Sequence, residues 1–149
     1  MTNGLAVNYF ALEPILIARL EEIDELVSVD GLPGISEVAE LAQRADRAYV
    51  VYRGERAPGG DKNIAGNDQI VFQQWTVYVV VRTAAQNNGS TAMLKQAGQL
   101  LRLINNKLQA WRPSNEVSVL RRITPPNPVY LRGAALFPLS YEVRLVERS

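Results

Sequence analysis

The longest apolar segment of the chain, Gln69 to Thr83, alternates with the period of a β-strand. One face carries Val71, Trp75, Val77, Val79 and Val81. The other face carries Ile70, Phe72, Tyr78 and Val80, interrupted only by Gln74, Thr76 and Arg82. A strand with one face in water would have polar residues at those alternate positions. The pattern therefore predicts a strand covered on both faces, and we expect other copies of the same chain to supply part of the cover.

Three segments have the apolar spacing of amphipathic helices. The first begins near Ala11 or Leu12, because Pro14 is tolerated only in a first turn. The second is short, is capped by Ser36 and covers "EVAELAQRA". The third is the clearest, with Ser90 as its N-cap and an end before Pro113. Its apolar positions are Leu94, Ala97, Leu101, Ile104, Leu108 and Trp111.

Four further segments read as strands: "LVSVDG", "RAYVVYRGE", "EVSVLRRIT" and "ALFPLSYEVRLVE". The last alternates as a half-buried strand does, and Pro138 indicates an edge or a bulge within it. Residues 54–68 have no periodicity and several turn-forming positions, so they are expected to form a long loop. The element order predicts a single α+β domain over residues 1–149, with a mainly antiparallel sheet and the helices packed on one face.

Composition narrows the possible partners. The 149 residues are 47% hydrophobic and 21% charged, which is typical of one globular domain. A net charge of +1 argues against binding nucleic acid through a basic surface, so protein partners are favoured. The absence of cysteine fits a reducing compartment, and neither an export signal nor a membrane-spanning run is found. Assembly in the cytoplasm is the expectation.

Candidate catalytic chemistry is sparse. With no histidine and no cysteine, the chain cannot build a Ser-His or Cys-His pair or a histidine-based metal site. The segment "APGGDKN" is rich in glycine but lacks the residue order of a phosphate-binding loop. Carboxylates that could pair as acid and base lie beside predicted turns, where aspartate commonly caps backbone groups: Asp30, Asp61, Asp68 and Glu116. We therefore expect no catalytic residue, no cofactor site and no metal site.

Charged residues form two groups. Four acidic residues, Glu21, Glu22, Asp24 and Glu25, are interpreted as the solvated side of the first helix or as a contact surface. The basic group lies in or near the strand and loop half of the chain and comprises Arg53, Arg56, Lys62, Arg121 and Arg122. Arg121 and Arg122 are consecutive in a predicted strand, so they point to opposite faces.

The order of elements resembles that of the tail terminator proteins of tailed phages, especially Mu-like phages with contractile tails. The segments that carry the resemblance are "ILIARLEEI", "YVVYRGE" with its long loop, "QQWTVYVVVRT", "AGQLLRLINNKLQAWRP" and "ALFPLSYEVRLVE". They span nearly the whole chain. The resemblance lies in element order, length and hydrophobic pattern and includes no short signature motif.

The resemblance implies a non-enzymatic virion protein that forms a hexameric ring on the head-proximal end of the tail tube. Such a ring stops tube polymerisation and receives the capsid neck. The implied partners are the tube protein, a neck or connector protein, the tail sheath, and DNA passing through the lumen. We expect contacts between copies at Phe72, Tyr78, Val80 and Arg82. Contacts with tube or neck are expected at the acidic group and at Arg53, Arg56 and Lys62. A head-tail joining or completion protein and a small ligand-binding α+β domain remain alternatives.

Overall fold

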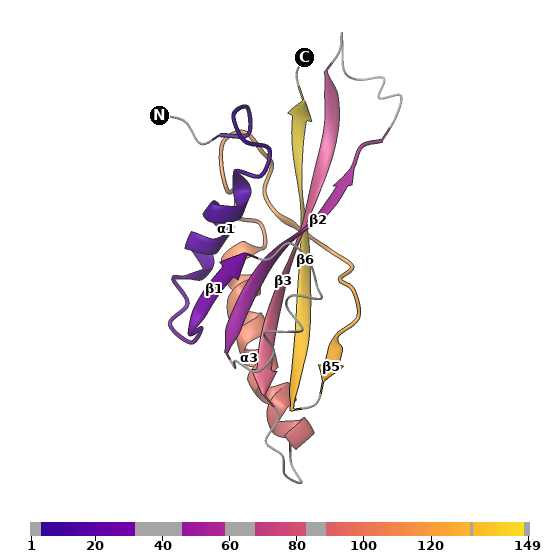
Figure 1. Ribbon diagram of the computed structural model, residues 1–149. Coiled ribbons are helices and arrows are strands. Elements are labelled where there is room, and N and C mark those ends of the chain that lie inside the picture. Colours follow the sequence, from indigo (N-terminus) through magenta and orange to yellow (C-terminus); the bar gives the residue numbers. More distant parts are fainter. Residues whose placement is uncertain (1–3, 32–45, 59–67, 83–88, 132, 148–149) are drawn as a thin grey trace.

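A computed structural model describes residues 4–31, 46–58, 68–82, 89–131 and 133–147. The described elements are α1 (Leu12–Leu20), β1 (Ser28–Gly31), β2 (Arg47–Arg56), β3 (Gln69–Arg82), α3 (Gly89–Leu108), β4 (Arg121–Ile123), β5 (Val129–Leu131) and β6 (Ala134–Glu147) (Figure 1). The predicted helix that follows Ser36 lies outside the described residues, as does Lys62. The start predicted for α1 is confirmed, whereas α3 begins at Gly89, one residue before its expected cap.

In the described parts of the chain, six strands form one sheet in the order β1-β2-β3-β6-β4, and β5 also pairs with β6. Only β1 and β2 run parallel; the other pairs are antiparallel. The two longest strands pair along their full length, from Gln69 opposite Glu147 to Arg82 opposite Ala134. The prediction of an α+β fold with a mainly antiparallel sheet is confirmed.

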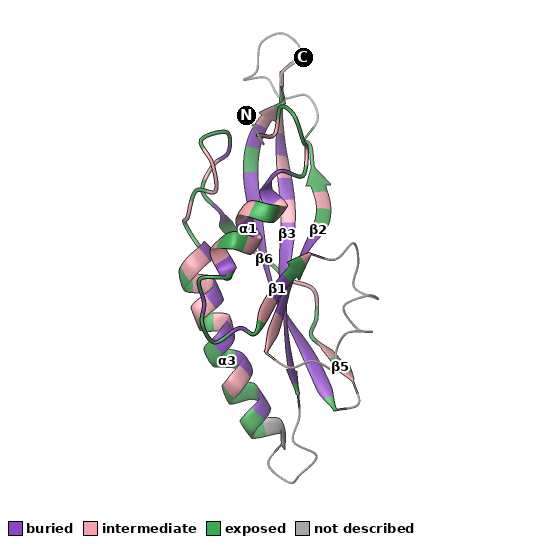
Figure 2. Cartoon of the chain, turned by 60° about the vertical axis from the view of Figure 1, so that its left-hand side comes forward, coloured by how far each residue is buried: buried purple, intermediate pink, exposed green. Residues whose placement is uncertain are grey.

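Both described helices lie on one face of the sheet, as predicted (Figures 1 and 2). Their buried residues join those of the sheet in the main core. They are Leu12, Leu16 and Leu20 of α1 and Met93, Ala97, Leu100, Ile104 and Leu108 of α3. One position was predicted wrongly: Leu94 is 53% exposed, because the buried stripe of α3 runs through Met93 and Leu100. Beyond the end of α3, Trp111 is half-buried and the Arg19 guanidinium lies 4.7 Å from its ring centroid.

The second face of the sheet is partly covered by the chain itself. Tyr49, Val51, Tyr78, Val80, Ala134 and Leu136 form a second buried cluster. Val129 and Leu131 of β5 pack against it. In this half of the second face, therefore, the apolar residues of β3 are covered by other residues of the same subunit.

The closing strand, β6, is more buried than the half-buried strand that its sequence pattern predicted. Residues 134–143 are buried at every position, because the helices cover one face of β6 and the second buried cluster covers part of the other. The strand lies inside the sheet and has neighbours on both edges. Pro138 is therefore not in an edge strand. Pairing with β5 extends to Leu136 and pairing with β4 begins at Ser140, so neither short strand pairs with the proline. No ladder hydrogen bond is lost on that side, which allows a proline in an inner strand.

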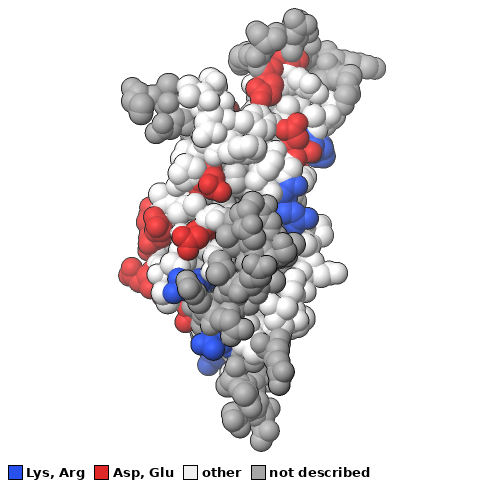
Figure 3. All heavy atoms as spheres, in the orientation of Figure 1, with Lys and Arg blue, Asp and Glu red and all other residues white. Residues whose placement is uncertain are grey.

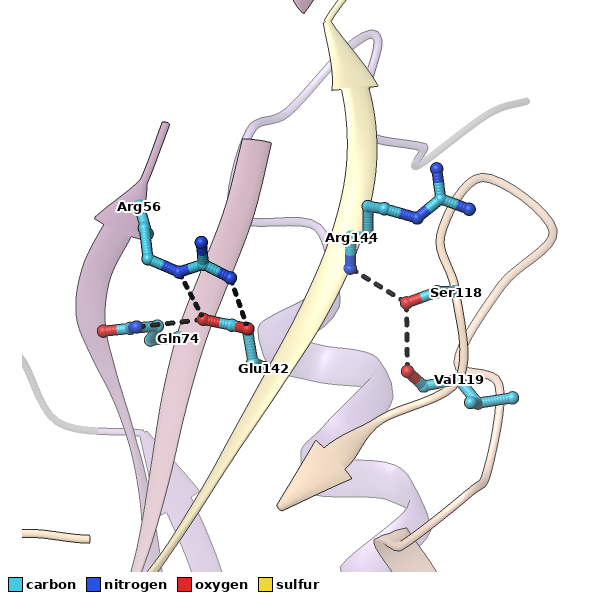
Figure 4. Close-up of polar contacts among 6 residues, drawn as sticks. All are labelled: Arg56, Gln74, Ser118, Val119, Glu142 and Arg144. Carbon is cyan, nitrogen blue, oxygen red and sulfur yellow. Dashed lines mark hydrogen bonds and ion pairs between the residues drawn. The ribbon is translucent and has the colours of Figure 1, made fainter. Parts of the chain in front are cut away.

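The segment expected to form a strand over "EVSVLRRIT" is regular only in β4. Before β4, Ser118 lies against the outer edge of β6 (Figure 4). Its amide donates to the Arg144 carbonyl at 2.9 Å, and its hydroxyl accepts from the Arg144 amide at 2.9 Å. The hydroxyl also donates to the Val119 carbonyl at 3.0 Å. One serine thus occupies the strand edge without extending the ladder.

A bulge in β2 changes which residues face the helices. Tyr52 pairs with Trp75, and the next paired residue of β2 is Gly54, opposite Gln74, which leaves Arg53 as the extra residue. Gly54 has φ of 111°, a conformation that favours glycine. After the bulge, Glu55 lies opposite Gln73 and Arg56 opposite Phe72.

Candidate functional site

The other half of the second face, beyond the buried cluster, is polar and carries several arginines. We call it the arginine face and define it by Arg53, Phe72 and Gln74, together with Arg56, Arg121 and Glu142. Strand register brings these residues together from four strands: Arg56 lies opposite Phe72, Gln74 opposite Glu142, and Glu142 opposite Arg121. A buried pair, Thr76 and Ser140, marks its border, with the two hydroxyl oxygens 2.6 Å apart.

Glu142 is the centre of the arginine face (Figure 4). Its side chain is only 9% exposed. Arg56 donates from Nη2 to Oε1 at 3.0 Å and from Nε to Oε2 at 3.3 Å, and Gln74 Nε2 donates to Oε2 at 3.1 Å. The Arg56 guanidinium also lies 4.0 Å from the ring centroid of Phe72. These contacts hold the fork of Arg56 in one orientation.

Electrostatics favour the ionised form of Glu142. Burial acts to raise the pKa of Glu142, but hydrogen bonds from Arg56 and Gln74 and the charges of Arg56 and Arg121 outweigh it, so the pKa lies below its usual value. Burial also raises the pKa of Tyr78, and the positive charge of Arg53 opposes that shift. Arg53 therefore lies near the boundary between the arginine face and the buried cluster.

The lowered pKa of Glu142 predicts a contribution to acid sensitivity. A carboxylate whose folded pKa is depressed stabilises the fold fully above its unfolded pKa of about 4.3 and loses this contribution as the pH falls through the folded pKa. We expect the free energy of unfolding to fall less steeply between about pH 5 and pH 3 in Glu142→Gln than in the natural chain. Urea titrations at several pH values measure how the free energy of unfolding depends on pH in each protein. The same dependence in both would contradict a lowered pKa of Glu142.

The acidic residues lie in the turns that follow α1 and not on its solvated side, because the helix ends at Leu20. We call Glu21, Glu22, Asp24 and Glu25 the acidic turn; all four are exposed. Glu22 pairs with Lys107 of α3 at 2.7 Å and with Arg19 at 3.7 Å. In the part of the chain that the structure describes, the other three form no ion pair. Figure 3 shows acidic side chains along the left edge, on the side of α1.

The remaining residues singled out from the sequence are dispersed. Tyr78 and Val80, expected at a contact between copies, are 3% and 0% exposed within the single chain. Phe72 is half-buried and Arg82 is exposed, so both are accessible. Arg122 is on the helix side, where Nη1 donates to Asn105 Oδ1 at 3.3 Å.

Two polar residues of the sheet were not identified as important from the sequence. Glu142 was read as one of the polar positions of a half-buried strand, and Gln74 as an interruption of an apolar face. One feature of the sequence pointed to them: Gln74 and Arg82 interrupt the apolar residues on the second face of β3. These two polar residues mark the ends of the buried part of that face. The pairing of Gln74 with Glu142 depends on a register that a single strand's pattern does not contain.

Neither a metal site nor an enclosed catalytic site is found among the described residues, where no group of three or more acidic, histidine or cysteine side chains is placed to hold an ion. A groove of about 660 Å³ lies between residues 5–9, the loop at 112–118 and the end of β6. Two of its charged lining residues already contact the chain: Glu116 accepts from the Leu5 amide at 3.0 Å, and Arg112 donates to the Val117 carbonyl at 2.8 Å. None of the described helices has the length and apolar character needed to cross a membrane.

Comparison with known proteins agrees with the resemblance. No curated protein matches the chain. The family model described as "Phage tail terminator protein" matches residues 5–149, which include every described helix and strand. A match over nearly the whole chain shows that this protein belongs to the phage tail terminator family.

Proposed function

We propose that the protein forms a ring, expected to be a hexamer, that caps the head-proximal end of the phage tail tube. The ring stops tube polymerisation and presents the surface on which the capsid neck docks. The observation that carries the proposal is the family match over residues 5–149, because it supports a structural role in the phage tail. The partners in this proposal are the tube protein and a neck or connector protein, and no catalytic role is inferred.

The distribution of charge fits such a subunit. A closed ring of identical subunits joins each copy to the next through two different surfaces, so a ring subunit needs surfaces of complementary chemistry. The acidic turn follows α1 on the helix side of the sheet, and the arginine face lies on the other side. The fold thus supplies two chemically distinct surfaces on one subunit.

Removing the gene tests the function. We expect the deletion strain to produce tails of uncontrolled length that fail to join heads, as seen by electron microscopy of lysates, and we expect the plasmid-borne gene to restore both properties. Tails of normal length joined normally to capsids would contradict the proposal. Tails of normal length that fail only to join heads would instead assign a head-tail joining role.

A further inference from the structure

The arginine face has a surplus of positive charge that the described chain does not neutralise. Arg56 and Arg121 lie near one carboxylate, Glu142, which is already held by Arg56 and Gln74. Arg53 lies near Tyr78 at the border of the face. Within the described residues Arg53 and Arg121 form no ion pair, and both are exposed. The half-buried ring of Phe72 lies under the Arg56 guanidinium. Arginine beside an aromatic side chain is a common composition at the centre of protein interfaces.

The acidic turn has the complementary charge and a fixed position. Ile23 and Leu26 alternate with its acidic residues and are 5% and 8% exposed, so they anchor the turn to the core. The ion pair between Glu22 and Lys107 ties it to α3. Glu21, Asp24 and Glu25 are therefore presented to solvent on a backbone that is already ordered. A pre-organised surface loses little conformational entropy when it binds.

The arginine face and the acidic turn lie on opposite sides of the sheet, so they do not pair with each other within one copy. The turn follows α1, which packs on the helix side, whereas the arginines belong to the second face. In Figure 3 acidic side chains follow the left edge but are also visible at the upper right, and Lys and Arg side chains are visible both toward the right edge and at the lower left. Two complementary patches on opposite sides of identical subunits favour a head-to-tail contact, which closes into a ring when the rotation between copies allows it.

We propose that the arginine face of one copy binds the acidic turn of a second copy of this chain. This assignment rests on the proposed ring and names the surfaces that join its subunits. Each copy binds one neighbour through its arginine face and the other neighbour through its acidic turn. In a closed ring, the charges of both groups are therefore neutralised. The contact is electrostatic in large part and should weaken as salt is added.

Charge reversal with rescue tests the contact. One variant carries Glu21→Lys and Asp24→Lys, a second carries Arg53→Glu and Arg121→Glu, and a third combines all four and keeps the net charge of the natural chain. Arg56 and Glu22 are left unchanged because they hold Glu142 and Lys107. Association is measured by sedimentation velocity, and thermal unfolding confirms that each variant is folded. The control is Glu147→Lys, at the exposed end of β6. It reverses a charge outside both proposed contact surfaces.

Each two-site variant is expected to associate roughly tenfold more weakly or worse, and the combined variant to recover most of the loss. Natural association in either two-site variant would overturn the proposal, and so would a combined variant no better than its parents. Variants that form normal rings but fail to complement the gene deletion would place these charges at the tube or neck. That result overturns the contact between copies and leaves the terminator function standing, whereas normal tails in the deletion strain remove the function itself.

Discussion

Replacing Val80 with lysine is expected to unfold the subunit. Val80 is 0% exposed and belongs to the buried cluster with Tyr78 and Leu136. A lysine there would place an ammonium group where no described carboxylate lies in the cluster, at a cost of about 4 kcal/mol or more. This is comparable to the whole stability of many domains, about 5–15 kcal/mol. Urea unfolding followed by circular dichroism measures the effect.

The matched control for this change is Val27→Lys, because Val27 is 65% exposed. The control should change the free energy of unfolding by no more than about 0.5 kcal/mol. If Val80→Lys kept the natural stability and lost only self-association, Val80 would lie at a contact between copies, as the sequence pattern suggested. The comparison therefore separates an internal role of this residue from an interfacial one.

Replacing Gln73 with leucine is expected to destabilise the fold by about 2–5 kcal/mol, because two polar groups lose their partners. Gln73 is 0% exposed on the helix side of β3. Its Nε2 donates to the Tyr9 carbonyl at 2.8 Å, and its Oε1 accepts from Trp75 Nε1 at 3.2 Å. Leucine has a similar volume but forms no hydrogen bond with the Tyr9 carbonyl or with Trp75 Nε1. Chemical denaturation gives the size of the loss.

A second readout identifies the cause. The Tyr9 contact connects the segment before α1 to the sheet, so amide hydrogen exchange of Val7 and Ala11, whose amides bond within that segment, should accelerate in Gln73→Leu. Gln99→Leu, at an exposed position of α3, is the matched substitution and should alter neither property. A loss no larger than that of Gln99→Leu would show that the hydrogen bonds of Gln73 contribute little.

The pattern of apolar positions predicted the element types well, because periodicity depends on local sequence. It located α1, α3 and the long strand β3, and it predicted correctly that β3 is covered on both faces near Tyr78. It did not identify the source of the cover. Val129 and Leu131 lie next to a proline-rich segment without alternation, and only pairing with β6 brings them over the cluster.

The arginine face was harder to predict for the same physical reason. Arg56 and Glu142 are 86 positions apart, and they meet only because β3 pairs with both β2 and β6 in one particular register. Arg53 and Arg56 of β2 were selected from the sequence, but the carboxylate that orients Arg56 was not. The acidic residues were assigned to a helix because their spacing continues that of α1, whereas the helix ends at Leu20.

The extra residue in β2 controls which side of the sheet receives each charge at the end of the strand. Because of it, Glu55 turns toward the helix side, where its carboxylate accepts a hydrogen bond from the Tyr9 hydroxyl, while Arg56 reaches Glu142. If β2 kept the same residues but had no bulge, regular pairing would place Glu55 opposite Phe72 on the second face and would turn Arg56 toward the helix side. The bulge therefore decides on which side of the sheet each of the two charges lies. Deletion of Arg53 would leave Gly54 opposite Gln74 and both charges in place, whereas a change that closes the bulge without removing a residue would exchange them.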